Sequence, residues 1–365
     1  MLRGSLLTLV ALLAIVGVVR SRLDGPSENG DPKAPKSNVS QQADQGLPAR
    51  LALGQMVVAR FAGPEPSPRF LARVRRGQIG GAILFAENLK GGKGGIAARI
   101  QRLQDAAEAG GNPPLLIAVD QEGGTVKRLP GPPSSSAAAM SADAARGEGE
   151  ATGELLGSLG IDVDLAPVVD VGHRGSFLGS RAFSSQPGEV ANRACEFAAG
   201  LRGKGVAATL KHFPGLGLAT VSTDEAPVTV EASATELRRD YAPYRKCGAQ
   251  PLTLVMVDSA VYPSLLGEEP AVMNPLTYRR ELTRARATGV TISDDLETPA
   301  IQSRVAPARR SIEAGLDLLL YATTESTSAD AYARLLEEVQ RGVVSPQRVR
   351  SAAAAILKLK SELEG

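Results

Sequence analysis

Charged side chains stand directly after apolar stretches at several points along this 365-residue chain. The positions that share this placement are Asp120-Gln121-Glu122, Asp170, Lys211-His212, Asp258 and Asp294-Asp295. Carboxylates can act as nucleophiles or proton donors, and lysine, arginine and histidine can donate hydrogen bonds to hydroxyl groups. Any one of these residues could instead cap a helix or face water. A chemical site is therefore predicted only if the fold brings them together.

The apolar stretches themselves are short and rich in β-branched residues, which is typical of buried strands. They are Met56–Phe61, Ala82–Phe85, Leu115–Asp120, Val163–Val171, Ala207–Phe213, Leu252–Asp258, Val290–Asp294 and Leu316–Tyr321. Segments with helical periodicity lie between them, including Gly95–Ala109, Glu189–Lys204, Ala234–Cys247 and Ile301–Ala314. Alternation of this kind predicts parallel strands, and eight such units are the number that closes a barrel.

We therefore predict an α/β fold, a single (β/α)₈ TIM barrel, with a doubly wound open sheet as the alternative. Two more helices are predicted after the eighth strand, over Thr327–Gly342 and Ser345–Glu364, the second opened by Ser345 and Pro346 as cap and first-turn residue. In such barrels the polar residues at the carboxyl ends of the strands form one face, where the chemistry takes place.

Composition and charge restrict the class of function. Hydrophobic residues make up 43% of the chain and charged residues 22%, as in ordinary globular proteins. The 41 basic and 39 acidic residues are intermixed and leave a net charge of only +2, so we expect no nucleic-acid partner. Cys195 and Cys247 both fall in predicted helices, and we expect two buried free thiols rather than a disulfide.

The first 47 residues differ from the rest in composition. Ser5–Val19 is almost continuously apolar and is flanked by Arg3 and Arg20. Its length suits a signal segment, and because no good cleavage site follows, an uncleaved signal anchor is favoured over a cleaved signal peptide or a buried helix. We assign residues 1–22 to this segment, 23–47 to a polar, disordered linker and 48–365 to the barrel. The barrel would then lie outside the cytoplasmic membrane, membrane-anchored or secreted.

Five segments, in this order, resemble glycoside hydrolase family 3, and in particular its single-domain β-N-acetylglucosaminidases. They are DQEGGTVKRL (Asp120–Leu129), LAPVVDV (Leu165–Val171), LGSRAF (Leu178–Phe183), KHFPGLG (Lys211–Gly217) and ISDDL (Ile292–Leu296). The resemblance runs from about Leu51 to Leu359. It implies a barrel, a retaining mechanism and an amino-sugar substrate, with cell-wall fragments as the expected source.

The resemblance also assigns roles to individual positions. Asp294, the first acid of SDDL, matches the nucleophile that forms a glycosyl ester. The matches to the sugar-holding residues are Asp120, Arg128, Arg181, Lys211 and His212. Asp120 can accept hydrogen bonds from hydroxyl groups, and the four basic residues can donate them. The alternative for Lys211 and His212 is a structural pair that braces the turn at Pro214.

One departure from the family pattern affects the proton donor. In related glucosaminidases KHFPGHG is followed by an Asp-Ser-His loop whose histidine is the general acid/base. Here the sequence is KHFPGLGLATVSTDE: Leu216 replaces one imidazole, Ser222 stands at the position of the loop Asp, and Asp224 stands at that of its His. The chain has two histidines, His173 and His212, neither on this loop. Asp224 is the first candidate for the acid/base and Glu225 the second.

Three functions follow from these residues. The first is a retaining hydrolase of terminal β-linked N-acetylglucosamine, the second a β-glucosidase of the same family, and the third a glycan-binding barrel with little or no catalysis. Two histidines and two cysteines far apart lack the spacing of metal ligands, so no metal or cofactor is expected. The expected partners are an amino-sugar glycan and, through the N-terminal segment, a membrane.

Overall fold

The computed structural model describes residues 46–364. The predicted signal segment, residues 1–22, and all but the last two residues of the 23–47 linker lie outside the described residues. Among the helices of the described part, none is both long and apolar enough to cross a membrane. The first helix of the described part is α2 (Ala49–Gln55).

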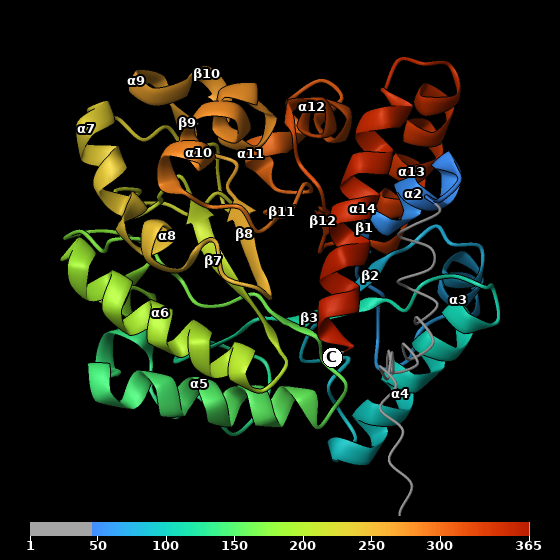
Figure 1. Cartoon of the computed structure of the whole chain (residues 1–365), viewed down its shortest axis with the longest axis horizontal. Helices are drawn as coiled ribbons and strands as arrows, with labels where there is room; N and C mark the ends of the chain where they lie inside the picture. The colour runs from blue at the N-terminus through green and yellow to red at the C-terminus, as the bar shows by residue number, and fades with distance from the viewer. Residues whose placement is uncertain (1–45, 365) are drawn as a thin grey trace, which may run out of the picture. The chain divides into compact units, whose positions relative to one another are not determined.

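Parallel strands, one from each predicted apolar run, form the centre of residues 46–364 (Figure 1). They are β1 (Val57–Ala59), β2 (Gly81–Leu84), β3 (Leu116–Val119), β6 (Val163–Asp164), β7 (Ala207–Phe213), β8 (Thr253–Val257), β11 (Val290–Ser293) and β12 (Leu319–Tyr321). Their order in the sheet is β11-β8-β7-β6-β3-β2-β1-β12, so each strand lies beside its sequence neighbour and β1 lies beside the last. That order confirms the predicted strands.

The sheet closes on itself between β11 and β12. The Ser293 N–H donates to the Leu318 carbonyl at 3.0 Å, and the Leu318 N–H donates to the Thr291 carbonyl at 2.8 Å. A parallel bridge joins Ile292 to Leu318 at the same place. An open, doubly wound sheet would leave these two edges apart, so the predicted TIM barrel is confirmed and the alternative is wrong.

Helices cover the outside of the barrel, and their starts follow ordinary capping chemistry. Ser67, Ser141 and Ser345 each accept a backbone N–H three residues ahead, which satisfies a donor that the first turn leaves unpaired. The longer helices are α3 (Pro68–Arg75), α4 (Gly92–Glu108), α5 (Ala142–Gly157), α6 (Pro187–Gly203), α12 (Pro307–Ala314), α13 (Glu325–Gln340) and α14 (Pro346–Leu363).

Two predicted helices are interrupted, and a proline lies in the first turn after each interruption. The segment predicted as Ala234–Cys247 consists of α7 (Ala234–Leu237), a 3₁₀ turn and α8 (Ala242–Cys247), whose first turn contains Pro243. The segment predicted as Ile301–Ala314 consists of α11 (Pro299–Gln302) and α12, separated by a bend before Pro307. Proline lacks the N–H that would continue the preceding turn, and Pro307 also disfavours helical geometry in Ala306, which is not helical.

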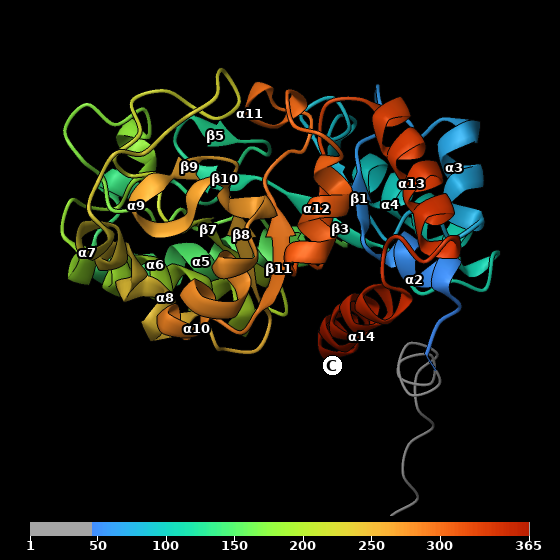
Figure 2. The same cartoon turned by 90° about the horizontal axis from the view of Figure 1, so that it is seen from above.

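The irregular connections at the carboxyl ends of the strands build one rim of the barrel. The hairpin of β4 (Gln121–Gly123) and β5 (Val126–Lys127) follows β3, and a long loop follows β7. In Figure 2, β5 and α11 lie on the same upper rim. Gly217 allows the β7 loop to pass close to the segment that follows β6, because a Cβ at that position would lie 1.8 Å from the Val171 carbonyl oxygen.

Cys195 and Cys247 form a disulfide bond, so the expectation of two free thiols is wrong. Cys195 lies in α6 and Cys247 ends α8, and the two helices pack against each other on the outside of the barrel. Helical periodicity predicted each cysteine correctly as a helix residue, but it carries no information on which helices become neighbours. The bridge closes a segment of 52 residues that contains β7 and the loop after it.

We expect removal of this bridge by Cys195→Ala with Cys247→Ala to lower the free energy of unfolding by about 2–4 kcal/mol, because the unfolded chain regains the freedom of that segment. Urea unfolding of the variant and of the oxidised protein measures the difference. Free-thiol titration of the unfolded wild-type protein is the control. Two titratable thiols in unreduced protein would contradict the bridge.

Candidate functional site

The predicted site residues meet in one cavity of about 490 Å³ at the carboxyl ends of the strands. Those that line it are Asp120, Arg128, Arg181, Lys211, His212, Asp224 and Asp294. Glu225 belongs to the same loop as Asp224 but does not line the cavity. The wall also includes apolar side chains, among them Phe85, Phe177 and Leu216.

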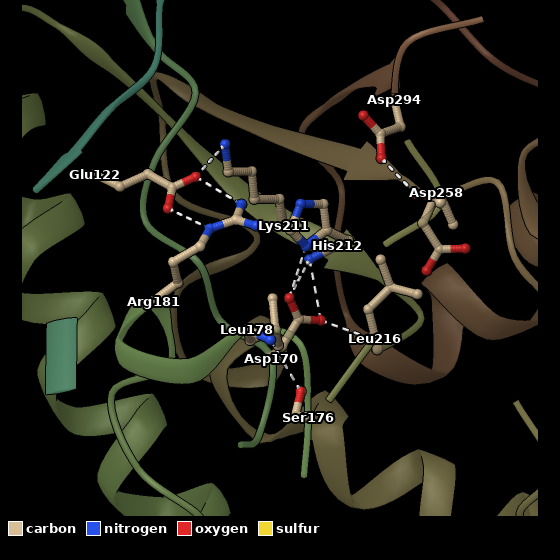
Figure 3. A network of polar contacts seen from close by, with 12 residues as sticks. Glu122, Asp170, Ser176, Leu178, Arg181, Lys211, His212, Leu216, Asp258 and Asp294 are labelled. Atoms are coloured by element: carbon tan, nitrogen blue, oxygen red, sulfur yellow. Dashed lines mark hydrogen bonds and ion pairs between the residues drawn. The ribbon is translucent and has the colours of Figure 1, made fainter. Parts of the chain in front are cut away.

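Lys211 lies at the centre of a buried cluster of charges. Its Nζ is 2.8 Å from Asp120 Oδ1 and 2.8 Å from Glu122 Oε1, and its side chain is only 3% exposed. Arg181 bonds both carboxylate oxygens of Glu122, at 2.8 and 2.9 Å, and Figure 3 shows Glu122 held between Lys211 and Arg181. Arg128 lies 3.5 Å from Asp120 and completes the cluster.

The charges of this cluster shift one another's pKa. Burial alone would raise the pKa of Asp120 and Glu122, but Lys211 and the neighbouring arginines hold both below their usual values. Burial alone would lower the pKa of Lys211, and the two carboxylates hold it above its usual value instead. All three groups are therefore charged at neutral pH, and their donors and acceptors keep fixed positions.

Glu122 lines the cavity, but no role for it was predicted from the sequence. Its position among the polar residues after the third strand was the only signal, and its bidentate bond to Arg181 depends on η2 (Gly179–Arg181), a turn far away in the sequence. Arg128 and Phe85, also distant in the sequence, form a cation–π contact. The Arg128 guanidinium lies 5.4 Å from the centre of the Phe85 ring.

His212 is oriented from below by Asp170. Its Nδ1 lies 2.7 Å from Asp170 Oδ2, while the Leu216 N–H donates to Asp170 Oδ1 at 2.7 Å (Figure 3). Asp170 is 1% exposed and does not line the cavity, so it acts on the site through the histidine. The sequence placed Asp170 at a strand end but gave it no partner.

Asp294 lies at the end of β11, on the side of the cavity opposite the charged cluster (Figure 3). Its Oδ1 accepts the Asp295 N–H at 2.9 Å, and its Oδ2 lies 3.5 Å from the Thr223 hydroxyl on the β7 loop. These contacts leave Asp294 free to meet a bound molecule.

Asp295, unlike Asp294, is engaged in hydrogen bonds to the next strand end. Its carboxylate accepts the Ala322 N–H at 3.1 Å and the Thr323 hydroxyl at 2.8 Å, which ties the end of β11 to the end of β12. Burial raises the pKa of Asp295 to about 6, although these bonds oppose the shift.

Asp224 lines the cavity from the β7 loop. Partial loss of hydration and the nearby charge of Asp294 raise its pKa, while His212, Ser222 and Arg181 oppose the rise. Its backbone N–H donates to the Ser222 hydroxyl at 3.2 Å, which makes a short turn of the loop. A carboxyl group with a raised pKa that faces another carboxylate is the arrangement expected of a proton donor.

Comparison with known proteins places these residues in a family. Residues 49–359 match the model of the glycosyl hydrolase family 3 N terminal domain. An uncharacterized secreted glycosyl hydrolase of Arthroderma benhamiae is 32% identical over 85% of this chain and 92% of its own length. The β-hexosaminidase LpqI of Mycobacterium tuberculosis is 32% identical over 70% of this chain and 71% of its own length.

Solved structures agree with the sequence matches. A family 3 β-N-acetylglucosaminidase from Paenibacillus sp. superposes with a TM-score of 0.81 at 31% identity over 87% of this chain. The chain spans 63% of that protein and 39% of a fungal multi-domain β-N-acetylglucosaminidase with a similar barrel.

Glu122→Gln should lower the free energy of unfolding at pH 7 by roughly 3 kcal/mol, because it leaves Lys211 and Arg181 buried with one carboxylate fewer. The pKa of Glu122 is lowered in the folded state, so its contribution is present above pH ~4.3 and is lost as the pH falls further. Urea unfolding at several pH values measures this.

Glu189→Gln is the matched control, because Glu189 pairs with Arg193 on the surface with its side chain 53% exposed. We expect it to change the free energy of unfolding by less than ~1 kcal/mol. Equal losses in the two variants, or a loss for Glu122→Gln that does not shrink in acid, would contradict the buried cluster.

Proposed function

This chain belongs to glycosyl hydrolase family 3, and from that premise we propose that it is a retaining β-N-acetylglucosaminidase. It removes terminal β-linked N-acetylglucosamine from cell-wall fragments through a covalent intermediate on Asp294. The observation that carries the proposal is the shared cavity, which holds Asp294 opposite a fixed group of hydrogen-bond donors and acceptors. Relatives named β-hexosaminidase and β-N-acetylglucosaminidase support the choice of sugar.

The proposed reaction has two steps on one face of the barrel. In the first, an Asp294 oxygen bonds to the anomeric carbon as the bond to the leaving oxygen breaks, and the acid/base group gives its proton to that oxygen. In the second, the deprotonated acid/base group takes a proton from water, the water oxygen bonds to the anomeric carbon, and the Asp294 carboxylate leaves. The Asp295 N–H fixes the orientation of the nucleophile at 2.9 Å.

The charged cluster would hold the sugar during both steps. Lys211, Arg128 and Arg181 outnumber Asp120 and Glu122 by one positive charge, which balances the charge of Asp294 in the same cavity. Their positions are fixed before the substrate binds, so little reorganisation is needed as charge develops.

Asp224 is the proposed acid/base. It lines the cavity with Asp294, and its pKa is raised by partial loss of hydration and by that neighbouring carboxylate. Glu225 stays the second candidate, although it does not line the cavity. A raised pKa increases the protonated fraction at neutral pH, which a carboxyl group needs if it is to replace the family's histidine.

We further propose that the enzyme works outside the cytoplasmic membrane. The disulfide between Cys195 and Cys247 supports an oxidising compartment, and a relative is described as secreted. The apolar segment Ser5–Val19 supports export or anchoring. Membrane attachment through residues 1–22 and the linker over 23–47 belong to this proposal.

A second candidate function is a glycan-binding barrel that cuts slowly or not at all. The observation in its favour is the β7 loop, where Ser222 and Asp224 replace the acid and the imidazole of the family pair. Such a protein would keep the sugar-holding cluster, and Asp294 would accept a hydrogen bond from a hydroxyl group. Hydrolysis of an activated substrate separates the two functions.

We expect rapid release of the aryl group from an activated aryl N-acetyl-β-glucosaminide and its loss, at least ~10³-fold, in Asp294→Ala, because no other group takes over the attack. A fluorinated mechanism-based inactivator should add one glycosyl unit to Asp294, detected by mass spectrometry of peptides. Turnover without an adduct there would contradict the nucleophile. Absence of aryl release favours the binding barrel, and preference for an aryl glucoside favours a β-glucosidase.

Asp224→Asn should reduce kcat/KM for a substrate with a poor leaving group by about 10²–10⁴-fold and affect an activated aryl glycoside far less, since only the former needs a proton from the enzyme. Because the acid must be protonated, kcat/KM of the wild type should fall as the pH rises through the raised pKa of Asp224. In Asp224→Asn this fall of kcat/KM with rising pH should be absent.

Glu225→Gln is the matched control on the same loop. It should keep both the leaving-group dependence and the pH profile of the wild type. If kcat/KM for the poor leaving group fell only in Glu225→Gln, Glu225 would be the acid/base. If both variants kept the wild-type pH profile, neither residue would be the proton donor.

A further inference from the structure

A second cavity of about 370 Å³ lies between the α11–α12 bend and α13, next to the catalytic cavity. The helices α12 and α13 lie side by side in Figure 1. Glu297, three residues after the nucleophile, lines both cavities. Its carboxylate is fully engaged with the next strand end, accepting the Thr323 N–H at 2.8 Å and the Thr324 N–H and hydroxyl at 3.1 and 2.9 Å.

The N-terminus of α12 opens into this second cavity. Ala306 is the N-cap and offers no side-chain cap, and Pro307 occupies the first turn. Ala306, Pro307, Ala308 and Arg309 all line the cavity. The first backbone N–H groups of a helix lack partners within it and carry partial positive charge, so an uncapped start facing a cavity favours an anion.

Tyr321, the last residue of β12, gives independent evidence for a ligand. It lines the second cavity and is only 2% exposed, yet its hydroxyl has no hydrogen-bond partner among residues 46–364. A buried hydroxyl without a partner is costly. The group is thus a donor already placed for a bound molecule.

Arginines bring positive charge to the second cavity. Arg304 and Arg334 line the cavity, and neither forms an ion pair within the part of the chain that the structure describes. Arg309 is shared between Glu338, at 3.7 Å, and Glu313, at 3.6 Å. Three arginines and two carboxylates, Glu297 and Glu338, line the cavity, so cationic groups outnumber anionic ones there by one.

The remaining wall is apolar. Leu296, Ala331 and Leu335 are buried and line the cavity together with the arginines. The volume of about 370 Å³ is within the range of sites for small organic molecules. A lone inorganic ion would leave this apolar surface uncovered, whereas a carboxylate with an apolar body would use both parts.

We propose that the second cavity is a binding site for a small organic carboxylate with an apolar body, such as the C-terminal end of a short peptide. The carboxylate takes the Tyr321 hydroxyl, the N-terminus of α12 and the two arginines without an ion pair in the described part of the chain, and the apolar body covers Leu296 and Leu335. The site is separate from the sugar-binding cavity and does not depend on the proposed hydrolysis.

The test uses titration calorimetry of the whole protein with N-acetylleucine as the probe. N-acetylleucinamide lacks the carboxylate, acetate lacks the apolar body, and inorganic phosphate is a different anion. We expect N-acetylleucine to bind at least about tenfold more tightly than the other three, because it alone supplies both features. Equal binding of the amide, or tighter binding of phosphate, would overturn the assignment.

Tyr321→Phe locates the site. It removes only a hydroxyl that has no partner among the residues that the structure describes, so the melting temperature should stay the same or rise, while binding of N-acetylleucine should weaken by about tenfold. Arg334→Gln should also weaken binding. Arg341→Gln is the matched control, because Arg341 lies beyond the end of α13 outside the cavity and pairs with Glu337.

Unchanged affinity in Tyr321→Phe would show that the probe binds elsewhere. Equal losses of affinity in Arg334→Gln and Arg341→Gln would show that the arginines act only through the general charge of the surface. Either result would overturn the proposed site.

Discussion

The buried ammonium group of Lys211 is the interaction on which this site depends. Removing a lysine and two carboxylates from water is costly, and their mutual attraction offsets that cost only when the geometry is good. Here each contact is 2.8 Å, and Arg181 satisfies the second oxygen of Glu122. The cluster draws together β3, the β4–β5 hairpin, η2 and β7, so it shapes the rim of the barrel as well as the cavity.

The same constraint explains how two kinds of carboxylate coexist on one rim. Asp120 and Glu122 contact cations and have lowered pKa values, whereas Asp224 lines the cavity with the charge of Asp294 nearby and has a raised one. Groups of one chemical type are thereby separated into fixed hydrogen-bond acceptors and a candidate proton donor. The loss of the loop histidine would be compensated by electrostatics in the cavity rather than by another imidazole, because His212 is already held by Asp170.

The sequence predicted the barrel because its evidence was local and repeated: each buried strand carries its own apolar run, and parallel strands bring their carboxyl ends to one face. The positions of Asp294 and Lys211 followed from that rule. The partners of Glu122 and Asp170 did not, since a bond between distant turns leaves no periodic trace. The disulfide was missed for the same reason, because Cys195 and Cys247 meet only through the packing of α6 on α8.

The interrupted helices show where local and tertiary preferences compete. An apolar periodicity over 301–314 favours one helix, but Pro307 prevents Ala306 from continuing it, and Ala306 adopts a left-handed conformation with φ of 48°. A non-glycine residue is strained there. The break turns the start of α12 toward Tyr321 and α13, which creates the second cavity directly behind Glu297. Because Glu297 also accepts the N–H of Thr323, which lines the first cavity, the same carboxylate forms part of the wall of both cavities.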